Sequence, residues 1–557
     1  MIYLEEKKCN KLAGLSSIFV TFEYNQKIVD ILKTCDCYYY DKKTHVWEVS
    51  VTNLARLLDE LVYIDELEFK LLKDEESTKV ERVVDYVTKP FQYQLEGIEY
   101  GLNKDKWLLL DAPGLGKTMS MIDLAEELHA QKNVKHCLII CGVNSLKGNW
   151  KREITKHSHL DCMILGEKIT KNNKIVYGSI KERAEQLMNK IDEFFIITNI
   201  ESFRDKEVVD AFNKSINNID MIIVDEIHKC KDPSSKQGEN ILKLHAKYKV
   251  GLTGTIIKNN PLDAYVPLKW TDNINCGITM FKKQFCIFGG IGGYQIIGYK
   301  NMELFKDILN SCSLRRTKDL LASQLPPKNI INEIVTLSDS HRKFYDDVVN
   351  GVKTSTNKVT LNTSSVRTMI IRLRQATACP SVLTTQNIVS SKIERAVDLA
   401  AELLSNNEKV VIFSMFKETC KELAKQLKEY SPVILNGDTD KSIVDSTIVK
   451  FQTDLNCKLL IATCECMGTG HSLHQQCSYA IFIDTPWTYA DYLQCQDRIH
   501  RLGSTKPVFI YNLICENTVD ELVNKIVSRK EAIGDYIVDN KLSESTANIL
   551  SQYIQDL

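Results

Sequence analysis

Residues 107–118 read WLLLDAPGLGKT, and the rest of the chain is organised around them. The short apolar run 107–110 predicts a buried strand, which the following proline and glycines break. Glycines at this point let backbone N–H groups turn inward around an anion. The apolar positions of 119–128 predict a helix whose N-terminus faces the same anion. Strand, loop and helix therefore follow one another in the order of a phosphate-binding P-loop.

In such a loop Lys117 supplies a positive charge to the β- and γ-phosphates of a nucleotide, and Thr118 supplies a hydroxyl to Mg²⁺. The generic pattern has glycine where this chain has Asp111, so a strict search for the motif fails. A glycine-containing turn that happens to carry Gly-Lys-Thr is the alternative interpretation. The residues expected to contact the nucleotide are Asp111, Pro113, Gly114, Leu115, Gly116, Lys117 and Thr118.

Length and composition indicate a multidomain globular protein. At 557 residues the chain predicts two to four domains, and 44% hydrophobic and 26% charged residues are typical of soluble proteins. No apolar run reaches transmembrane length, and the opening residues 1–11 are too polar for a signal peptide. We therefore expect a soluble intracellular protein without a membrane partner.

The 18 cysteines are scattered and form no C-x-x-C pair, which predicts reduced, packed thiols. A metal site is a disfavoured alternative, since its cysteines fall in a strand-like run. The net charge of −1 means that any nucleic acid would bind through a local basic stripe. The potential metal ligands are Cys464, Cys466, His471, His474 and Cys477.

The chain before the P-loop predicts a small α+β domain over about 1–75. Its pattern gives strands, helices and a core that includes Tyr38, Tyr40 and Trp47. The polar run 73–82 predicts a linker. The expected strands are 18–22, 38–40 and 46–51, and the expected helices are 28–32 and 54–61.

From Pro90 onward strands alternate with helices, which predicts parallel sheets in two comparable blocks, 84–255 and 390–557. The stretch 256–389 between them is helical and irregular in pattern. Its glycine-rich segment 289–293 indicates a flexible connection, because no Lys-Ser/Thr follows. The expected strands are 108–110, 137–141, 194–198, 221–224 and 250–252 in the first block, and 410–413, 433–435, 459–462, 480–483 and 508–512 in the second.

Two adjacent carboxylates, Asp225 and Glu226, follow the predicted strand 221–224. In nucleotide hydrolysis Asp225 would hold Mg²⁺ and Glu226 would orient and deprotonate the attacking water. A solvated turn is the alternative for an isolated Asp-Glu pair. The position at the end of a buried strand, downstream of a P-loop, favours the hydrolytic role.

Other motifs add to this site. Gln94 could read the adenine edge, since an amide both donates and accepts. The hydroxyls of 252–255 could relay the state of hydrolysis. Arg498 and Arg501 are three residues apart, so a helix would present both on one face as arginine fingers for a γ-phosphate. A surface helix with two solvated arginines is the alternative.

Taken in order, these motifs resemble those of superfamily two helicase-type motors, specifically the Swi/Snf-related DNA translocases. Asp111 is the usual first residue of the P-loop in that family, whereas Ser504 stands where the family usually has glutamine. The matching segments are Gln94, 111–118 (DAPGLGKT), 149–153 (NWKRE), 198–201 (TNIE), 225–232 (DEIHKCKD), 252–260 (LTGTIIKNN), 314–318 (LRRTK), 325–328 (LPPK), 373–375 (LRQ), 410–416 (VVIFSMF), 468–473 (GTGHSL), 484–487 (DTPW) and 494–503 (QCQDRIHRLG).

The resemblance implies an α/β fold with two tandem RecA-like P-loop lobes and Swi/Snf-type helical insertions, preceded by the small α+β domain. It implies lobe 1 over 84–255, insertions over 256–389 and lobe 2 over 390–557. It also implies ATP and Mg²⁺ as cofactors, with Gly470, Arg498 and Arg501 contributing to the nucleotide site.

The expected partner is double-stranded or forked DNA, bound by a monomeric motor. The arginines of 314–318 and 372–374, namely Arg315, Arg316, Arg372 and Arg374, have two interpretations, DNA electrostatics or buried packing. The residues expected to contact DNA by the resemblance are Thr198, Asn199, Lys229, Ser414, Thr463 and Trp487.

The segment from Tyr40 to Trp47, together with Tyr24, is similar to the HepA-related-protein (HARP) domain of annealing helicases. This similarity implies a substrate-recognition role for 1–75 in an enzyme that rewinds strands or remodels forks. A remodeller of nucleoprotein or polymerase has the same motor and is the main alternative. An RNA-dependent ATPase is disfavoured by the LRRTK–LPPK insertion, and a non-catalytic DNA-binding scaffold by the complete set of catalytic residues.

Overall fold

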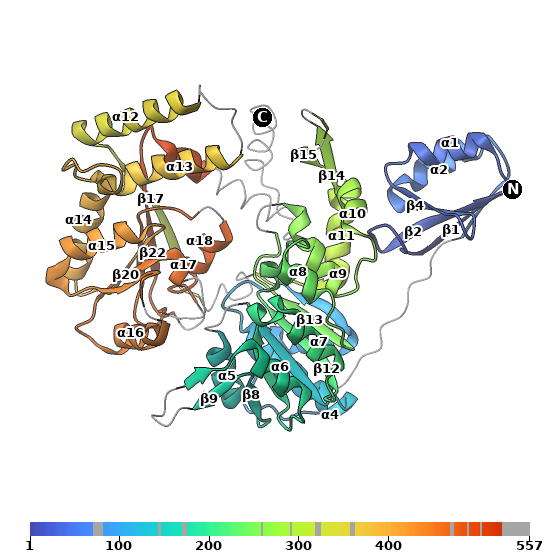
Figure 1. Cartoon of the computed structure of the whole chain (residues 1–557), viewed down its shortest axis with the longest axis horizontal. Coiled ribbons are helices and arrows are strands. Elements are labelled where there is room, and N and C mark those ends of the chain that lie inside the picture. The colour runs from blue at the N-terminus through green and yellow to red at the C-terminus, as the bar shows by residue number, and fades with distance from the viewer. Residues whose placement is uncertain are drawn as a thin grey trace. The chain divides into compact units, whose positions relative to one another are not determined.

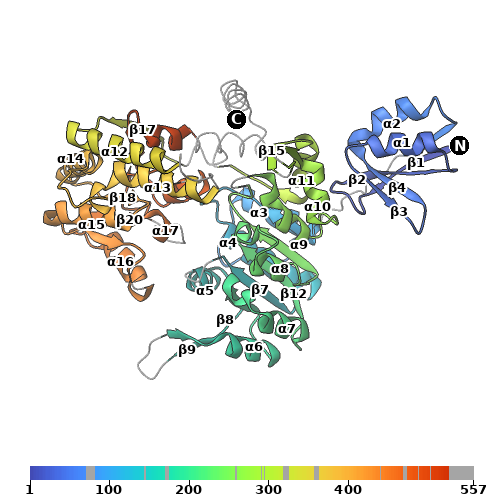
Figure 2. The ribbon, with the colours of Figure 1, turned by 45° about the horizontal axis from the view of Figure 1, so that its top comes forward.

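The computed structural model describes two compact units, each built around its own parallel β-sheet (Figure 1 and Figure 2). Apart from loop residues 113–115, the described residues up to Thr317 form the first unit, and those from Leu325 onward form the second. None of the helices within the described ranges is long and apolar enough to cross a membrane. The described residues are 1–70, 82–142, 146–169, 175–257, 260–289, 292–293, 295–317, 325–356, 363–439, 441–467, 473–486, 489–501 and 504–525.

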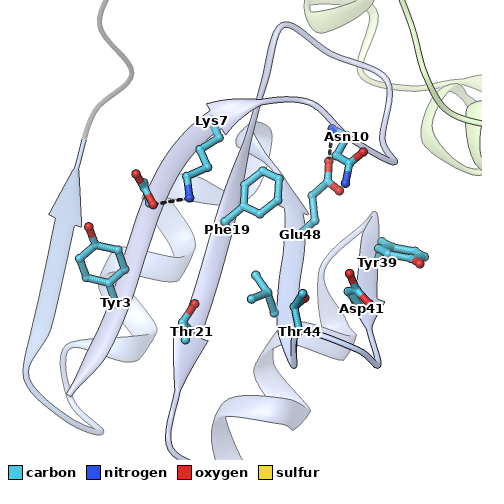
Figure 3. A pocket seen from close by; sticks show the side chains of 11 residues that line it. Tyr3, Lys7, Asn10, Phe19, Thr21, Tyr39, Asp41, Thr44 and Glu48 are labelled. Atoms are coloured by element: carbon cyan, nitrogen blue, oxygen red, sulfur yellow. Dashed lines mark hydrogen bonds and ion pairs between the residues drawn. The ribbon is translucent and has the colours of Figure 1, made fainter.

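The first 70 residues form a small α+β domain with a five-stranded sheet in the order β3-β4-β2-β1-β5. Ile2 and Leu4 alternate with polar neighbours along β1, so one face of the sheet packs on α1 and α2 (Figure 1). The other face carries Tyr3, Phe19 and Tyr39 (Figure 3). The elements are β1 (Ile2–Lys8), β2 (Ser16–Phe22), α1 (Gln26–Thr34), β3 (Tyr38–Asp41), β4 (Val46–Ser50), η1 (Val51–Asn53), α2 (Leu54–Leu61) and β5 (Leu67–Lys70).

The loop between β1 and β2 contacts a helix far along the chain. The Ala13 N–H donates to Gln284 Oε1 at 2.9 Å, and Gln284 Nε2 donates to the Ala13 carbonyl at 2.5 Å. Both residues are buried. A buried amide with both ends paired fixes one backbone position, so this loop is attached to the insertion that follows the first sheet.

The main sheet of the first unit has seven parallel strands in the order β16-β6-β13-β12-β7-β11-β8. Its strands read as continuous apolar runs because helices cover both faces. The elements are α3 (Gln92–Asn103), β6 (Lys106–Leu109), α4 (Lys117–Lys132), β7 (His136–Cys141), α5 (Leu146–His157), β8 (Cys162–Ile164), β9 (Glu167–Ile169), β10 (Ile175–Tyr177), α6 (Ile180–Met188), β11 (Phe195–Asn199), η2 (Ile200–Arg204), α7 (Lys206–Lys214), β12 (Ile219–Asp225), η3 (Ile227–Cys230), α8 (Lys236–Ile241) and β13 (Tyr248–Leu252).

The insertion after β13 is helical with one β-hairpin. Phe281, Phe285 and Phe305 pack edge to face in its core. The antiparallel strands β14 and β15 flank the glycine-rich segment, which was predicted as a flexible connection. The elements are η4 (Pro261–Ala264), α9 (Tyr265–Trp270), α10 (Ile278–Phe285), β14 (Cys286–Gly289), β15 (Gln295–Tyr299), α11 (Met302–Cys312) and β16 (Ser313–Leu314).

The second unit has six parallel strands in the order β17-β22-β21-β18-β20-β19. The elements are β17 (Lys328–Val335), α12 (Asp339–Thr356), α13 (Thr363–Ala378), η6 (Pro380–Val382), α14 (Ser391–Ser405), β18 (Val410–Ser414), α15 (Lys417–Gln426), η7 (Lys428–Tyr430), β19 (Val433–Leu435), α16 (Lys441–Thr453), β20 (Leu459–Thr463), α17 (Cys464–Met467), β21 (Tyr479–Phe482), α18 (Tyr489–Gln496) and β22 (Val508–Cys515).

These two parallel sheets and the small domain in front confirm the predicted α/β fold class. The ten strands expected in the two blocks are present, but β8, β9 and β10 in the first block and β14 to β17 in the stretch 256–389 were missed, as were β1 and β5 of the small domain. Of these, β8, β16 and β17 each join the edge of a main sheet. One face of β17, which carries Lys328, Ile330, Asn332 and Ile334, is exposed, and this is typical of an edge strand and not of a buried one.

Helix α4 buries a group of acidic residues. Glu127 accepts from the backbone N–H groups of Val83 and Val84, and Glu126 accepts from Ser158. Asp123 is 1% exposed, and neither of its carboxylate oxygens has a hydrogen-bond partner among the described residues. Burial, reinforced by the two neighbouring glutamates, raises the pKa of Asp123 from 3.8 to about 8.

We predict that Asp123→Asn stabilises the protein increasingly as the pH rises from about 5 to about 8. The folded-state pKa lies above the unfolded-state value, so unfolding releases a proton and stability falls as the pH rises through this window. Asparagine removes this loss, and the gain at pH 8 should be about 1–3 kcal/mol. Melting temperatures of both proteins across the pH range measure it.

The matched control is Asp192→Asn, at a carboxylate that is 79% exposed, which should show no such trend. An equal difference between Asp123→Asn and the wild type at pH 5 and pH 8 would contradict the assignment of a buried, protonated side chain.

Candidate nucleotide-binding site

The loop between β6 and α4 has the backbone shape of an anion-binding turn. Gly114 and Gly116 have φ of +90° and +75°, a region that residues with a side chain rarely adopt. A methyl group on Gly116 would also lie 2.5 Å from Gln94 Nε2. Gln94, 2% exposed, therefore lies directly against the loop, although its Oε1 accepts from the Phe91 N–H and caps α3.

Lys117 and Thr118 open helix α4, as the sequence predicts. The Lys117 ammonium donates to the backbone carbonyl of Asp111 at 2.8 Å, so its charge lies over the start of the loop. The Asp111 carboxylate points away from the loop and is fully buried in an ion pair with Arg316. Among the residues expected to contact the nucleotide, Asp111 therefore uses its side chain for the ion pair with Arg316.

The Asp225–Glu226 pair lies at the end of β12. Glu226 has φ of +53°, a left-handed conformation that turns the chain sharply after the strand. Trp150 Nε1 donates to Asp225 Oδ2 at 2.9 Å. Burial raises the pKa of Asp225, and the neighbouring Glu226 charge adds to this rise.

Glu226 contacts a buried histidine–threonine pair. His228 Nδ1 lies 3.1 Å from Glu226 Oε2 and 2.9 Å from Thr253 Oγ1. Burial alone would raise the pKa of Glu226, but the contact with His228 and the charge of Lys117 outweigh it and lower that pKa. The site therefore favours the ionised form of Glu226, whereas the raised pKa of the neighbouring Asp225 disfavours its ionised form.

The hydroxyls predicted to relay the state of hydrolysis lie within this site. The Thr253 N–H donates to the Leu109 carbonyl at 3.1 Å, which ties the end of β13 to the end of β6. Its Oγ1 accepts from the Thr255 N–H and contacts His228. Thr253 thus connects the P-loop strand with the acidic pair.

The first unit also carries a polar groove beside the acidic pair. The groove measures about 460 Å³ and is lined on one side by Arg204, Lys229 and Lys231, with Glu201 and Asp232 among the other lining residues. Lys229 was expected as a DNA contact, whereas Arg204, which stands in no motif, and Lys231, which stands in the motif 225–232, were not. Arg204 is exposed at the end of η2.

Thr198 and Asn199 end strand β11, but their side chains are nearly buried. Thr198 Oγ1 contacts Ser202 Oγ at 3.1 Å, and Asn199 Oδ1 accepts from the same hydroxyl at 2.7 Å. Arg183 donates to Ser202 at 2.8 Å. In this conformation the two residues shape the start of η2 and do not face solvent.

In the second unit the expected residues again stand at strand ends. Ser414 ends β18 and donates to Asp484 Oδ2 at 2.6 Å, and Thr463 ends the adjacent strand β20. Arg374, one of the four arginines with two interpretations, is 1% exposed and donates to the Thr485 carbonyl, which favours packing. Arg372 is exposed. Gly470 and Trp487 lie outside the described residues.

The prediction that one helix presents Arg498 and Arg501 is wrong. Helix α18 ends at Gln496, and both arginines follow it in consecutive turns. Ser504 stabilises these turns, since its Oγ accepts from the Arg501 N–H at 3.1 Å and donates to the Ile499 carbonyl at 3.2 Å. A short hydroxyl thus takes a local structural role where the resembled family usually has glutamine.

The metal-site alternative gains no support from the side chains that can be placed. Cys464 and Cys477 are buried free thiols, and Cys466 is half-buried. Across the described ranges no group of three or more potential ligands could hold a metal ion. His471, one of the candidate ligands, lies outside those ranges.

A parallel seven-stranded sheet with a P-loop at one strand end and an Asp-Glu pair at another is the arrangement found in P-loop nucleoside triphosphatases. Family models identify the chain further. The SNF2-related domain matches residues 93–382, more than half of the chain, and the helicase conserved C-terminal domain matches 391–503. The chain belongs to the SNF2-related family.

Curated relatives agree with this assignment. The chain is 27% identical over 510 residues to an uncharacterised ATP-dependent helicase of Mycoplasma genitalium, covering 88% of this chain and 46% of that protein. It is 23% identical to the ATP-dependent helicase FUN30 of Saccharomyces cerevisiae (84% and 48%) and 24% identical to a RAD54-like DNA repair and recombination protein of Drosophila ananassae (78% and 60%). The chain spans about half the length of the curated relatives it matches.

A solved structure, the Sulfolobus solfataricus SWI2/SNF2 ATPase core in complex with dsDNA, is 22% identical. The match covers 83% of this chain and 95% of that one, with a TM-score of 0.38.

Proposed function

We propose that this protein is an ATP-dependent translocase on double-stranded DNA of the annealing-helicase or fork-remodelling kind. The observation that carries the ATPase part is the single edge of the first sheet, where the P-loop with Lys117 follows β6 and the pair Asp225–Glu226 stands at the end of β12. Membership of the SNF2-related family supports the same reading.

In this proposal the P-loop backbone and Lys117 bind the triphosphate, with Gln94 against the loop at the adenine side. Thr118 and Asp225 would hold Mg²⁺, and their hydroxyl and carboxylate oxygens are the hard donors that this ion prefers. When bound, Mg²⁺ neutralises charge on the phosphate oxygens.

Glu226 is suited to orient the attacking water and accept its proton, because the contact with His228 keeps it ionised and fixes its direction. Thr253 contacts His228 and is hydrogen-bonded to the P-loop strand, so a change in the protonation or position of Glu226 would be transmitted through it to the sheet. We propose that Arg498 and Arg501 stabilise the charge that develops on the γ-phosphate.

The DNA part of the proposal rests on family membership and on the groove lined by Arg204, Lys229 and Lys231. Arg204 and Lys229 are exposed, whereas Lys231 is half-buried and pairs with Asp263 at 2.9 Å. Exposed cations beside the hydrolytic pair suit phosphate contacts that carry no sequence information. The names of the RAD54-like relatives, which are DNA repair and recombination proteins, agree with a DNA substrate. A remodeller of nucleoprotein or polymerase would use the same motor, and an RNA-dependent ATPase is the less favoured alternative.

The annealing or fork-remodelling part rests on the small N-terminal domain. We propose that it is HARP-like and recognises the DNA substrate. A cavity of about 490 Å³ on this domain is lined by aromatic and basic side chains, among them Tyr24, Tyr40, His45 and Trp47. Tyr24 is 82% exposed, and exposed rings of this kind suit stacking on unpaired bases.

We predict that Lys117→Ala and Glu226→Gln each lower kcat for ATP at least about 100-fold in a protein that remains folded. Lysine loss removes charge from the phosphates, and glutamine cannot accept the proton of the attacking water. Phosphate release in the presence of duplex DNA measures the effect. The exposed ion pair Lys243–Glu239 supplies matched controls, Lys243→Ala and Glu239→Gln, which should turn over ATP normally. Undiminished turnover in Lys117→Ala would refute the ATPase assignment.

We predict that duplex or forked DNA stimulates ATP hydrolysis, and that this stimulation falls steeply with salt. Arg204→Gln should leave the rate without DNA unchanged and reduce the slope of log affinity against log salt by about one. Arg395→Gln is the control, because that arginine pairs with Glu333 in the second unit. Stimulation by RNA alone would favour the RNA-dependent alternative.

We predict that removing residues 1–73 preserves basal ATP hydrolysis but impairs strand annealing or fork reversal. Because Ala13 is hydrogen-bonded to Gln284, the deletion exposes a buried amide. Tyr24→Ala is therefore the sharper variant, since its side chain is exposed and its loss should not disturb the fold. Annealing and fork-reversal assays on oligonucleotide substrates compare the two with the wild type. Intact annealing in both would mean that this domain has another role.

A further inference from the structure

The P-loop of this protein is held by a segment more than 200 residues further along the chain. Strand β16 lies parallel to β6, and the Leu110 N–H donates to the Leu314 carbonyl at 2.8 Å. Two residues on, the Ala112 N–H donates to the Arg316 carbonyl at 2.9 Å. The backbone on both sides of Asp111 is therefore fixed by residues 314–316.

The side chain of Asp111 is fixed by the same segment. Arg316 Nε donates to Asp111 Oδ1 at 2.9 Å, and Arg316 Nη2 donates to Oδ2. Asp111 is 0% and Arg316 6% exposed, so this is a buried, two-pronged pair. Such a pair fixes direction as well as position, because the planar guanidinium matches both carboxylate oxygens.

Helix α3 is shaped to accept the guanidinium. Arg316 Cζ lies 5.3 Å from the ring centroid of Tyr93. A methyl group on Gly97 would lie 2.9 Å from Arg316 Nη2 and 3.3 Å from Nη1, so the glycine leaves the space that the guanidinium occupies. Arg316 therefore joins α3, which carries Gln94, to the base of the loop.

The neighbouring arginine extends the junction to the end of β13. Arg315 Nη1 donates to the Leu110 carbonyl at 3.0 Å and lies 3.3 Å from the Gly254 carbonyl. Residues 314–316 thus contact α3, the P-loop and the segment after β13. They stand directly before Thr317, the last described residue of the first unit.

We propose that Arg316 is a positioning residue for the P-loop, which it sets through the carboxylate of Asp111. With its side chain clamped and its flanking N–H groups bound, Asp111 presents its backbone carbonyl to Lys117 Nζ at 2.8 Å. The pair thereby fixes where the Lys117 ammonium lies before a nucleotide binds. The consequence for ATP rests on the proposed function, whereas the clamp itself does not.

Two variants test the clamp, Arg316→Lys, which keeps the charge and loses the fork, and Gly97→Ala, which crowds the guanidinium. Gly148→Ala is the matched control, because a methyl group on that helical glycine meets nothing within 4 Å. Hydrogen exchange of the nucleotide-free proteins, read in peptides that cover 107–118, is the primary measurement. We expect hydrogen exchange in these peptides to become about tenfold faster in Arg316→Lys and Gly97→Ala, because the equilibrium constant for local opening rises about tenfold. In Gly148→Ala the exchange rate should stay unchanged.

ATP affinity is the second measurement. We expect Arg316→Lys and Gly97→Ala to raise KM for ATP about tenfold with a smaller change in kcat, because the lysine is displaced but not removed. If Arg316 only stabilised the fold, its substitution would instead speed up hydrogen exchange throughout the first unit and leave the KM for ATP of the folded protein unchanged. That outcome, or unaltered exchange over 107–118, would overturn the proposal. If the wild type hydrolyses no ATP, the proposed function fails, and the exchange measurement still decides whether Arg316 sets the loop.

The double variant Asp111→Gly with Arg316→Met keeps the proposal testable if a single variant does not fold. Removing one partner leaves a buried charge unpaired, whereas removing both does not. We therefore expect the double variant to melt closer to the wild type than Asp111→Gly does. Its exchange over 107–118 should nonetheless remain fast, because the clamp is gone. Exchange restored to the wild-type rate would overturn the proposal.

Discussion

The structure depends on one constraint, that parallel strands in register end at a common edge. Strand β13 lies between β6 and β12, and Leu252 pairs with Leu109 on one side and with Asp225 on the other. The P-loop, the acidic pair and Thr253 follow these three ends directly. Elements more than 100 residues apart in sequence are brought within hydrogen-bond distance because the ladder fixes their register. A slip of one residue in either pairing would move Asp225 or the loop to the opposite face of the sheet.

The carboxylates at this edge are buried or half-buried, and each one has a polar partner. Asp225 accepts from Trp150, Glu226 contacts His228, and Asp111 is clamped by Arg316. A buried charge without such a partner would be neutralised. Asp123 shows this in the neighbouring helix, where burial without a partner raises its pKa until the side chain holds a proton at neutral pH. Glu226, with His228 beside it, and Asp123, without a partner among the described residues, thus have pKa values shifted in opposite directions within a single unit.

Local pattern predicts the central strands of both main sheets, the P-loop and the acidic pair, because each depends on a few consecutive residues. It fails where an element owes its state to a distant partner. Strand β16 has only two residues and exists because β6 offers its edge. The spacing of Arg498 and Arg501 suggests a helix, yet α18 ends before them, and the Ser504 hydroxyl holds the turns that carry them. Trp150, His228 and Arg316 complete the site through contacts that span 75, 25 and 205 residues, which no periodicity reveals.

Residues that break a local rule are therefore informative about long-range structure. Asp111 stands where a generic P-loop has glycine, and a buried carboxylate there would be costly without a cation beside it. Gly97 interrupts a helix that would be more stable with alanine by about 1 kcal/mol. Each departure costs stability alone, and the two become favourable together because Arg316 fits the space left by one and pairs with the charge of the other. The glycine in α3 and the aspartate in the loop are best understood as a single feature, whose third part is the arginine at the end of the insertion.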